Sequence, residues 1–193
     1  MKALILLGTL KTKGRSNTET LVEFFGSYLK DQNIDYEVIK LCDHHIVPGT
    51  YTKMDVPDDW PAIYQKILDA TIILFATPLW WNSHSSELQR AIERLDEVYD
   101  MILAGKDSPL EGKIGGVIIT GDSDGVEHVT GNIANFFCSV GIALPPYSSL
   151  GVIWDGHAKD ASKTKAQLLA HYKREYAKDA KAMAESLAKF GKK

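Results

Sequence analysis

Strand-length apolar runs alternate with helix-periodic apolar stripes along most of the chain, and this alternation constrains the fold more than any other feature. The intervening stripes place several apolar residues on one helical face, as within residues 21–29, 88–102 and 129–140. Continuous apolar runs are typical of parallel strands that are buried on both faces. Strands that alternate with helices favour an open sheet with right-handed crossovers. We therefore predict an α/β fold, a doubly wound five-stranded parallel sheet of order 2-1-3-4-5 with helices on both faces. The expected strands lie at residues 3–7, 36–41, 71–76, 114–119 and 147–154.

The last part of the chain is rich in alanine and lysine and carries a narrow apolar stripe from Leu169 to Leu187. This pattern predicts a long C-terminal helix over about 159–190. So short a segment has no core of its own and must pack on the sheet or on another subunit. We therefore expect one domain over residues 1–193, with a core at 1–154 and a helical extension at 155–193.

Composition narrows the partners that such a domain can have. The 22 basic and 25 acidic residues give a formal net charge of -3, which indicates neither a nucleic-acid surface nor an acidic tail. No apolar run approaches the length of a membrane span, and the six-residue apolar stretch near the N-terminus is too short for a signal peptide. Only two cysteines occur, far apart, which disfavours a disulfide framework or a metal cluster. A cytoplasmic protein with a small-molecule partner, no nucleic acid and no membrane is the expectation.

Three unusual loops follow the first, third and fourth expected strands, at the edge where such sheets bind ligands. The first, GTLKTKGRSNTET, places Thr9, Ser16, Asn17 and Thr18 where a helix begins, so that hydroxyls and backbone N–H groups converge on an anion. Any one of the last three residues could instead be a simple helix N-cap. The loop also resembles a nucleotide-hydrolase phosphate loop, but its spacing is one residue too long and Arg15 replaces the lysine. Its cations Lys11, Lys13 and Arg15 add positive charge or are plain solvated residues.

The second and third loops offer an aromatic platform and a polar glycine turn. In ATPLWWNSHSSE, Trp80 and Trp81 stand in a turn, where two adjacent rings cannot easily both point into the core, although one of them can. In TGDSDGVEH, two glycines and two aspartates allow a close backbone approach and accept hydrogen bonds, or form an ordinary turn. A phosphate cradle, a flat platform and a polar turn at one edge match the parts of FMN.

With these motifs in place, the sequence resembles the flavodoxin-like NAD(P)H-dependent FMN reductase family from Met1 to about Trp154. The resemblance rests on the serine-asparagine-threonine run of the first loop, on TPLWWNSHSSELQRAIERLD and on TGDSDGVEH. The first loop is about two residues longer than the usual family form, and the loop after the second strand lacks the cysteines that bind an iron-sulfur cluster in some relatives. The resemblance implies FMN as the cofactor, NADPH or NADH as the electron donor, and a cofactor site at Thr9, Lys11, Arg15, Ser16, Asn17, Thr18, Pro78, Leu79, Trp80, Trp81, Asn82, Ser83, Thr120, Gly121, Asp122, Gly125 and His128.

The activity implied by this resemblance is hydride transfer to FMN N5, followed by electron transfer to a quinone, a flavin or another small acceptor. Flavin supplies the chemistry, so no catalytic acid or base and no metal is expected. An electron-carrying flavodoxin and a non-catalytic flavin-binding module stay open as alternatives. A nucleotide hydrolase is disfavoured because no apolar strand ends in an aspartate that could hold magnesium.

Several other features invite a role. His84 and Glu87 could lie one helical turn apart, but no third metal ligand is evident, and adjacent His44 and His45 are poor chelators alone. The long connection at 43–59 favours a functional loop that could gate the site. The resemblance also implies a homodimer or homotetramer, for which the C-terminal helix is a candidate interface.

Overall fold

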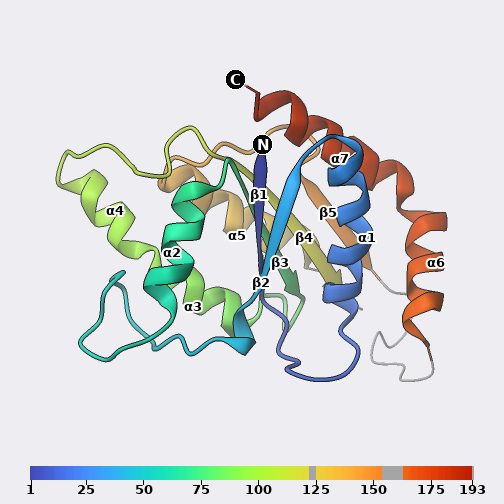
Figure 1. The fold of residues 1–193 in the computed structure, drawn as a ribbon, viewed down its shortest axis with the longest axis horizontal. Coiled ribbons are helices and arrows are strands. Elements are labelled where there is room, and N and C mark those ends of the chain that lie inside the picture. Colours follow the sequence, from blue (N-terminus) through green and yellow to red (C-terminus); the bar gives the residue numbers. More distant parts are fainter. Residues whose placement is uncertain (122–124, 154–162, 193) are drawn as a thin grey trace.

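A single parallel sheet forms the centre of the molecule (Figure 1). The computed structural model describes residues 1–121, 125–153 and 163–192. The five strands run in the order β2-β1-β3-β4-β5, so the predicted fold class and strand order are confirmed. The strands are β1 (Lys2–Leu7), β2 (Asp35–Lys40), β3 (Ile72–Pro78), β4 (Ile114–Gly121) and β5 (Ser149–Ile153).

The apolar runs form the strands because both faces of the sheet are covered. Almost every residue of β1, β3 and β4 is buried, while β2 at one edge is mixed. The register pairs Leu7 with Ala76 and Pro78 with Thr120 at the carboxyl ends of these central strands. The loops that follow β1, β3 and β4 therefore start side by side.

Helices cover the two faces in two groups, each with its own apolar core. The first group comprises α2 (Trp60–Asp69), α3 (Ser86–Arg94), α4 (Asp96–Leu103) and α5 (Val126–Ser139). The second group comprises α1 (Asn17–Asp31), α6 (Lys165–Glu175) and α7 (Ala177–Phe190). A short 3-10 turn, η1 (Leu41–Asp43), follows β2. The stripe at 88–102 is thus divided between α3 and α4, and α2 was not predicted from the sequence.

The C-terminal segment forms two consecutive helices, α6 and α7, where one long helix was expected. The change occurs at Tyr176, whose φ of -119° and ψ of 6° depart from helical values. The expected stripe faces inward: Tyr172, Met183 and Leu187 are buried in the core on the α1 side of the sheet. These apolar side chains are therefore used within the chain, which removes them as an interface between subunits.

The connection from 44 to 59 is fixed to the α3–α4 corner by one buried guanidinium. Arg94 has no exposed surface and donates to Tyr51 O at 2.8 Å, Val47 O at 2.9 Å and Thr52 O at 3.1 Å, and it forms an ion pair with Asp58. Its guanidinium also lies 5.6 Å from the ring centre of Trp60.

The charge and hydrogen bonds of Arg94 set the direction of the pKa shift of Asp58. Burial alone would raise the pKa of Asp58, but the hydrogen bonds and the positive charge of Arg94 outweigh burial and lower this pKa. At the other side of the corner, the Glu97 carboxylate accepts from Thr52 N at 2.7 Å. A segment held by so many contacts is part of the scaffold, and none of these contacts indicates a role in gating the site.

Candidate functional site

The first loop is held together by the hydroxyl groups of residues that were predicted from the sequence to lie in the site. Thr9 Oγ1 and Ser16 Oγ lie 2.9 Å apart, and Ser16 is the N-cap of α1, accepting from Glu19 N at 3.2 Å. Thr18 Oγ1 lies 2.7 Å from Thr120 Oγ1 at the end of β4. All four side chains are buried. The N-cap interpretation of Ser16 is therefore right, and the hydroxyls also join the loops after β1 and β4.

Positive charge surrounds the same helix start. Lys11 Nζ donates to Arg15 O at 2.9 Å and so closes the loop on itself. Lys13 is exposed and Arg15 is half-buried. Asn17 opens α1, so backbone N–H groups and the positive end of the helix dipole meet these cations at one place. Such a place suits an anion such as a phosphate.

The second loop is a two-residue hairpin that presents an indole to solvent. Trp80 N donates to Ser83 O and Ser83 N to Trp80 O, both at 2.8 Å. The central residues Trp81 and Asn82 have φ values of 48° and 60°, as in the turns that suit tight hairpins. Trp81 is 98% exposed and Trp80 37% exposed. Neither ring is consumed by the core, so both are available at the edge of the sheet.

The second and third loops are packed against each other. Leu79 N donates to Thr120 O at 2.7 Å, and Leu79 lies against Gly121. Gly125 has a φ of +128°, and a Cβ added there would meet Asn82 Oδ1 at 2.3 Å. Only glycine allows this approach without strain. The structure thus brings together residues from all three predicted loops.

One member of the predicted set, His128, makes none of these contacts and is exposed on the first turn of α5. Another member, Asp122, lies outside the described residues. Sequence reasoning missed two supporting residues: Thr77 Oγ1 accepts from Ser85 N at 2.9 Å, and Ser85 caps α3 by accepting from Leu88 N at 3.3 Å. Their spacing of eight residues across an irregular loop gives no periodic signal.

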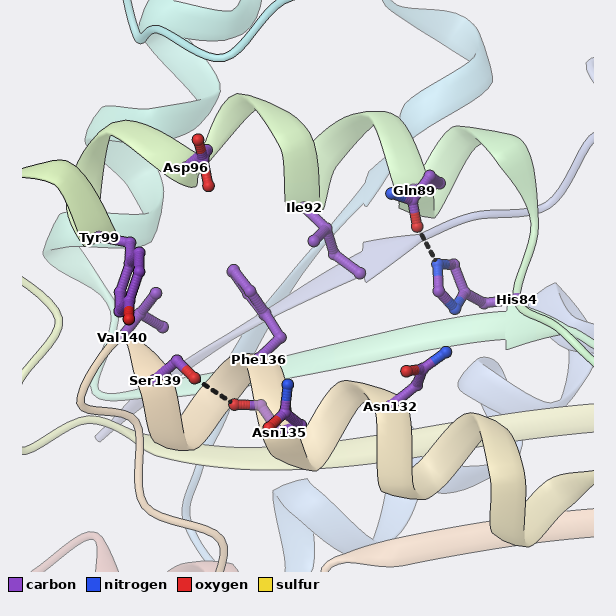
Figure 2. A pocket seen from close by; sticks show the side chains of 10 residues that line it. All are labelled: His84, Gln89, Ile92, Asp96, Tyr99, Asn132, Asn135, Phe136, Ser139 and Val140. Carbon is purple, nitrogen blue, oxygen red and sulfur yellow. Dashed lines mark hydrogen bonds between the residues drawn. The ribbon is translucent and has the colours of Figure 1, made fainter.

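A groove lies beside the hairpin, between α3–α4 and α5 (Figure 2). It has a volume of about 420 Å³ and begins at His84, the residue that follows the hairpin. One wall comes from Gln89, Ile92, Asp96 and Tyr99, and the other from Asn132, Asn135, Phe136, Ser139 and Val140. The His84 ring was considered from the sequence only as a metal ligand, a role for which the described residues offer no group of three or more His, Cys, Asp or Glu.

The residues at this edge fit FMN in three respects. A helix start with nearby cations suits the phosphate, as the buried Ser16 cap and exposed Lys13 show. The exposed indole of Trp81 and the hairpin backbone offer a flat neighbour for an isoalloxazine ring. The close contact between Gly125 and Asn82 Oδ1 holds the start of α5 against the hairpin, so the loops after β3 and β4 meet at this edge. Fold and site together define the class of flavodoxin-like flavin-binding proteins.

Comparison with known proteins identifies the family within this class. The sequence pattern that defines the family described as NADPH-dependent FMN reductase matches residues 1–154, and the chain belongs to this family. Among the described residues, no helix combines the length and apolar character that crossing a membrane requires.

Two curated relatives and one solved structure show what the chain is similar to. It is 30% identical over 168 residues to 8-demethyl-8-aminoriboflavin-5'-phosphate synthase of Streptomyces davaonensis, covering 82% of this chain and 65% of that protein. It is 31% identical over 163 residues to the divalent metal cation transporter MntH of Mycobacterium bovis, covering 82% of this chain and 24% of that protein. The chain thus spans less than two thirds of the length of either relative.

The solved structure shares the fold. The crystal structure of RosB with bound 8-demethyl-8-formylriboflavin-5'-phosphate has a TM-score of 0.78 and 23% sequence identity, covering 100% of this chain and 79% of that chain. The similarity extends beyond residue 154, where the match to the family pattern ends.

Proposed function

We propose that the chain binds FMN at the edge formed by the loops after β1, β3 and β4, and uses it to pass electrons from NAD(P)H to a small-molecule acceptor. The observation that carries this proposal is the convergence of the capped α1 start, the Trp80–Ser83 hairpin and the glycines Gly121 and Gly125. Bound flavin would supply the redox chemistry. The chain needs only to hold and orient it.

Each loop has its own task in this proposal. The first loop, with Lys11, Arg15 and the residues Ser16 to Thr18, holds the phosphate through backbone N–H groups, hydroxyls and positive charge. Residues Pro78 to Ser83 line the isoalloxazine, and Trp81 excludes water from one side of it. Residues Thr120 to Gly125 cover another part of the ring, where Gly125 permits the close approach.

Spectroscopy on the purified protein tests the proposal. Addition of FMN to flavin-free protein should shift the flavin absorbance and quench its fluorescence, and NADH or NADPH added without oxygen should bleach the bound flavin. Comparison of the two nucleotides gives the donor preference. Absence of FMN uptake would overturn the proposal. Uptake without reduction by either nucleotide would favour the flavodoxin-type carrier or the non-catalytic module.

A second candidate function follows from one relative. The 30% identity to a riboflavin-phosphate-modifying synthase suggests a role in which the flavin phosphate is a substrate that leaves chemically changed. Mass spectrometry of the flavin recovered after incubation separates the two functions. An unchanged FMN mass after many turnovers with NAD(P)H supports the reductase, and a changed mass supports flavin modification.

We also propose self-association into a homodimer or homotetramer. Large apolar side chains are exposed on the 44–59 segment and on α4: Leu103 is 69% exposed and Val56 57%. The two elements are in contact, because Thr50 O accepts from Glu97 N at 3.1 Å. Exposed apolar surface is a feature of protein interfaces. Light scattering on the purified protein measures the mass, and Leu103→Glu should lower it if this surface is the contact.

A cytoplasmic location completes the proposal. Cys42 and Cys138 are both free, and Cys138 is exposed. Exposed free thiols suit a reducing compartment. Fractionation of cells that express the full protein tests this, and recovery in an oxidising compartment would contradict it.

A further inference from the structure

The groove between α3–α4 and α5 has a chemical character distinct from the phosphate end of the site. None of its ten lining residues is a lysine or an arginine, and its one carboxylate, Asp96, lies at the start of α4. Ile92, Tyr99 and Phe136 provide apolar and aromatic surface, while amides and a hydroxyl provide hydrogen-bonding groups. Phosphate-bearing molecules find no cation here. An uncharged aromatic molecule with polar substituents fits this lining.

The groove also lies where a ligand could reach the flavin site. Its end at His84 directly follows Ser83, which closes the hairpin, and Ser85 caps α3. Figure 2 shows the imidazole at this end, with the two helical walls running away from it toward Tyr99 and Val140. The volume of about 420 Å³ is within the range of small-molecule sites.

A chain of hydrogen bonds sets which nitrogen of His84 carries its proton. Gln89 Nε2 donates to the Glu93 carboxylate at 3.0 Å. An ionised carboxylate can only accept hydrogen bonds, so the group that faces Glu93 is the amide NH₂. The Gln89 amide oxygen therefore faces His84, whose Nε2 lies 2.6 Å away. Because an amide oxygen can only accept, His84 Nε2 must be the donor. In the neutral ring, Nδ1 is then left with its lone pair as an acceptor.

The other ring nitrogen has an unmet hydrogen-bonding capacity. Nδ1 of His84 is shielded from water and has no hydrogen-bond partner among the described residues. A buried polar atom without a partner in a native protein calls for an explanation, and a ligand that brings a donor is one. A donor that reaches Nδ1 meets little competition from solvent.

We propose that this groove binds a flat, uncharged aromatic compound whose phenolic hydroxyl donates a hydrogen bond to His84 Nδ1. The aromatic body lies on Ile92 and Phe136, and the amides of Asn132 and Asn135 meet polar substituents at its rim. In the proposed function, this groove is where the electron acceptor binds and is reduced, and that role rests on the proposed function. The binding itself requires neither FMN nor a nicotinamide.

Two probes that differ only in the donor test the proposal on the full chain, first loaded with FMN and then without it. 2-Naphthol carries a hydroxyl, and 2-methoxynaphthalene has the same rings without the donor. By calorimetry, 2-naphthol should bind about 3–10-fold more tightly than its methyl ether, the range expected for one hydrogen bond. The ¹⁵N resonance of His84 Nδ1 should move with 2-naphthol alone.

Two variants and one control tie the result to the groove. His84→Phe should erase the difference between the probes, and Asn135→Trp, which fills the groove from an exposed position, should abolish binding of both. His45→Phe, at an exposed histidine in the 44–59 segment, should change nothing. Equal affinities of the probes, an unchanged preference in His84→Phe, or a dimer that covers the groove and binds neither probe would each overturn the proposal. Failure of FMN uptake is a separate measurement and bears only on the proposed function.

Discussion

The loops that follow the neighbouring strands β1 and β2 are stabilised in opposite ways. The segment at 44–59 gives its polar groups to the protein: three of its carbonyl oxygens and one carboxylate bind the buried Arg94. The loop at 8–16 is held by neutral hydroxyls, such as Thr9 against Ser16, and by a hydrogen bond from Lys11 to Arg15 O, and it leaves Lys13 exposed. A loop whose charges are paired inside serves as scaffold, whereas a loop held without a buried ion pair keeps an exposed cation such as Lys13 for a ligand.

Loss of Arg94 should have the largest effect on this contrast. Arg94→Met leaves the Asp58 carboxylate buried without its partner, and removing one member of a buried pair costs about 3–5 kcal/mol. Urea unfolding measures the loss. Arg90→Met, at a partly exposed arginine that donates to Ile46 O, should cost about 1 kcal/mol or less. Equal losses of stability in the two variants would contradict the conclusion that Arg94 is the main residue that fixes the 44–59 segment.

Acid should weaken the same scaffold. Because the pKa of Asp58 is lowered in the folded state, its contribution to stability is complete above the ordinary aspartate pKa of about 4 and is lost as pH falls through the lower folded value. Asp58→Asn should lose about 1–3 kcal/mol at pH 7. The gap between wild type and variant should narrow below about pH 4. A gap that stays constant from pH 7 to pH 3 contradicts this expectation.

A smaller loss is expected at the cap of α1. Ser16→Ala removes the acceptor for Glu19 N and the partner of Thr9, and an N-cap serine is worth about 1 kcal/mol. Ser16→Thr keeps a hydroxyl and should recover most of the stability. If the first loop holds phosphate, Ser16→Ala should also weaken FMN binding more than riboflavin binding, since riboflavin lacks the phosphate. Fluorescence titration with both flavins measures this.

The exposed lysines Lys13 and Lys53, one in each loop, should differ in their effect on FMN binding, although neither should affect the free energy of unfolding much. Lys13→Ala should leave the free energy of unfolding within about 0.5 kcal/mol of wild type. The same change should weaken FMN binding by about 2–5-fold, as expected for one exposed charge near an anion. Lys53→Ala, the matched change in the 44–59 segment, should leave FMN binding unchanged. The comparison fails if both lysines contribute equally.

The strands were predictable because a central strand that is buried on both faces has a continuous apolar sequence. Their order was predicted from the regular alternation of strands and helices. The position of the candidate site was predicted from topology, which puts the loops after β1, β3 and β4 at one edge. Arg94 could not be found in this way, because a fully buried arginine reads in sequence as an ordinary polar residue at a helix end. The division of the C-terminal helix at Tyr176 was missed because the same apolar stripe serves one helix or two.

The residues beyond the family match, which ends at residue 154, contribute to the core of the domain. α7 seals the sheet face on the α1 side: Met183 fills the space that the absent Cβ of Gly116 leaves on β4, and Leu187 is fully buried. We propose that evolutionary and physical boundaries differ here, and that residues 1–193 form one domain. A chain cut after residue 154 would retain the whole family pattern, yet expose Leu74 and Ile118 to water and should precipitate. Transfer of residues 1–154 into another protein would therefore also require α6 and α7.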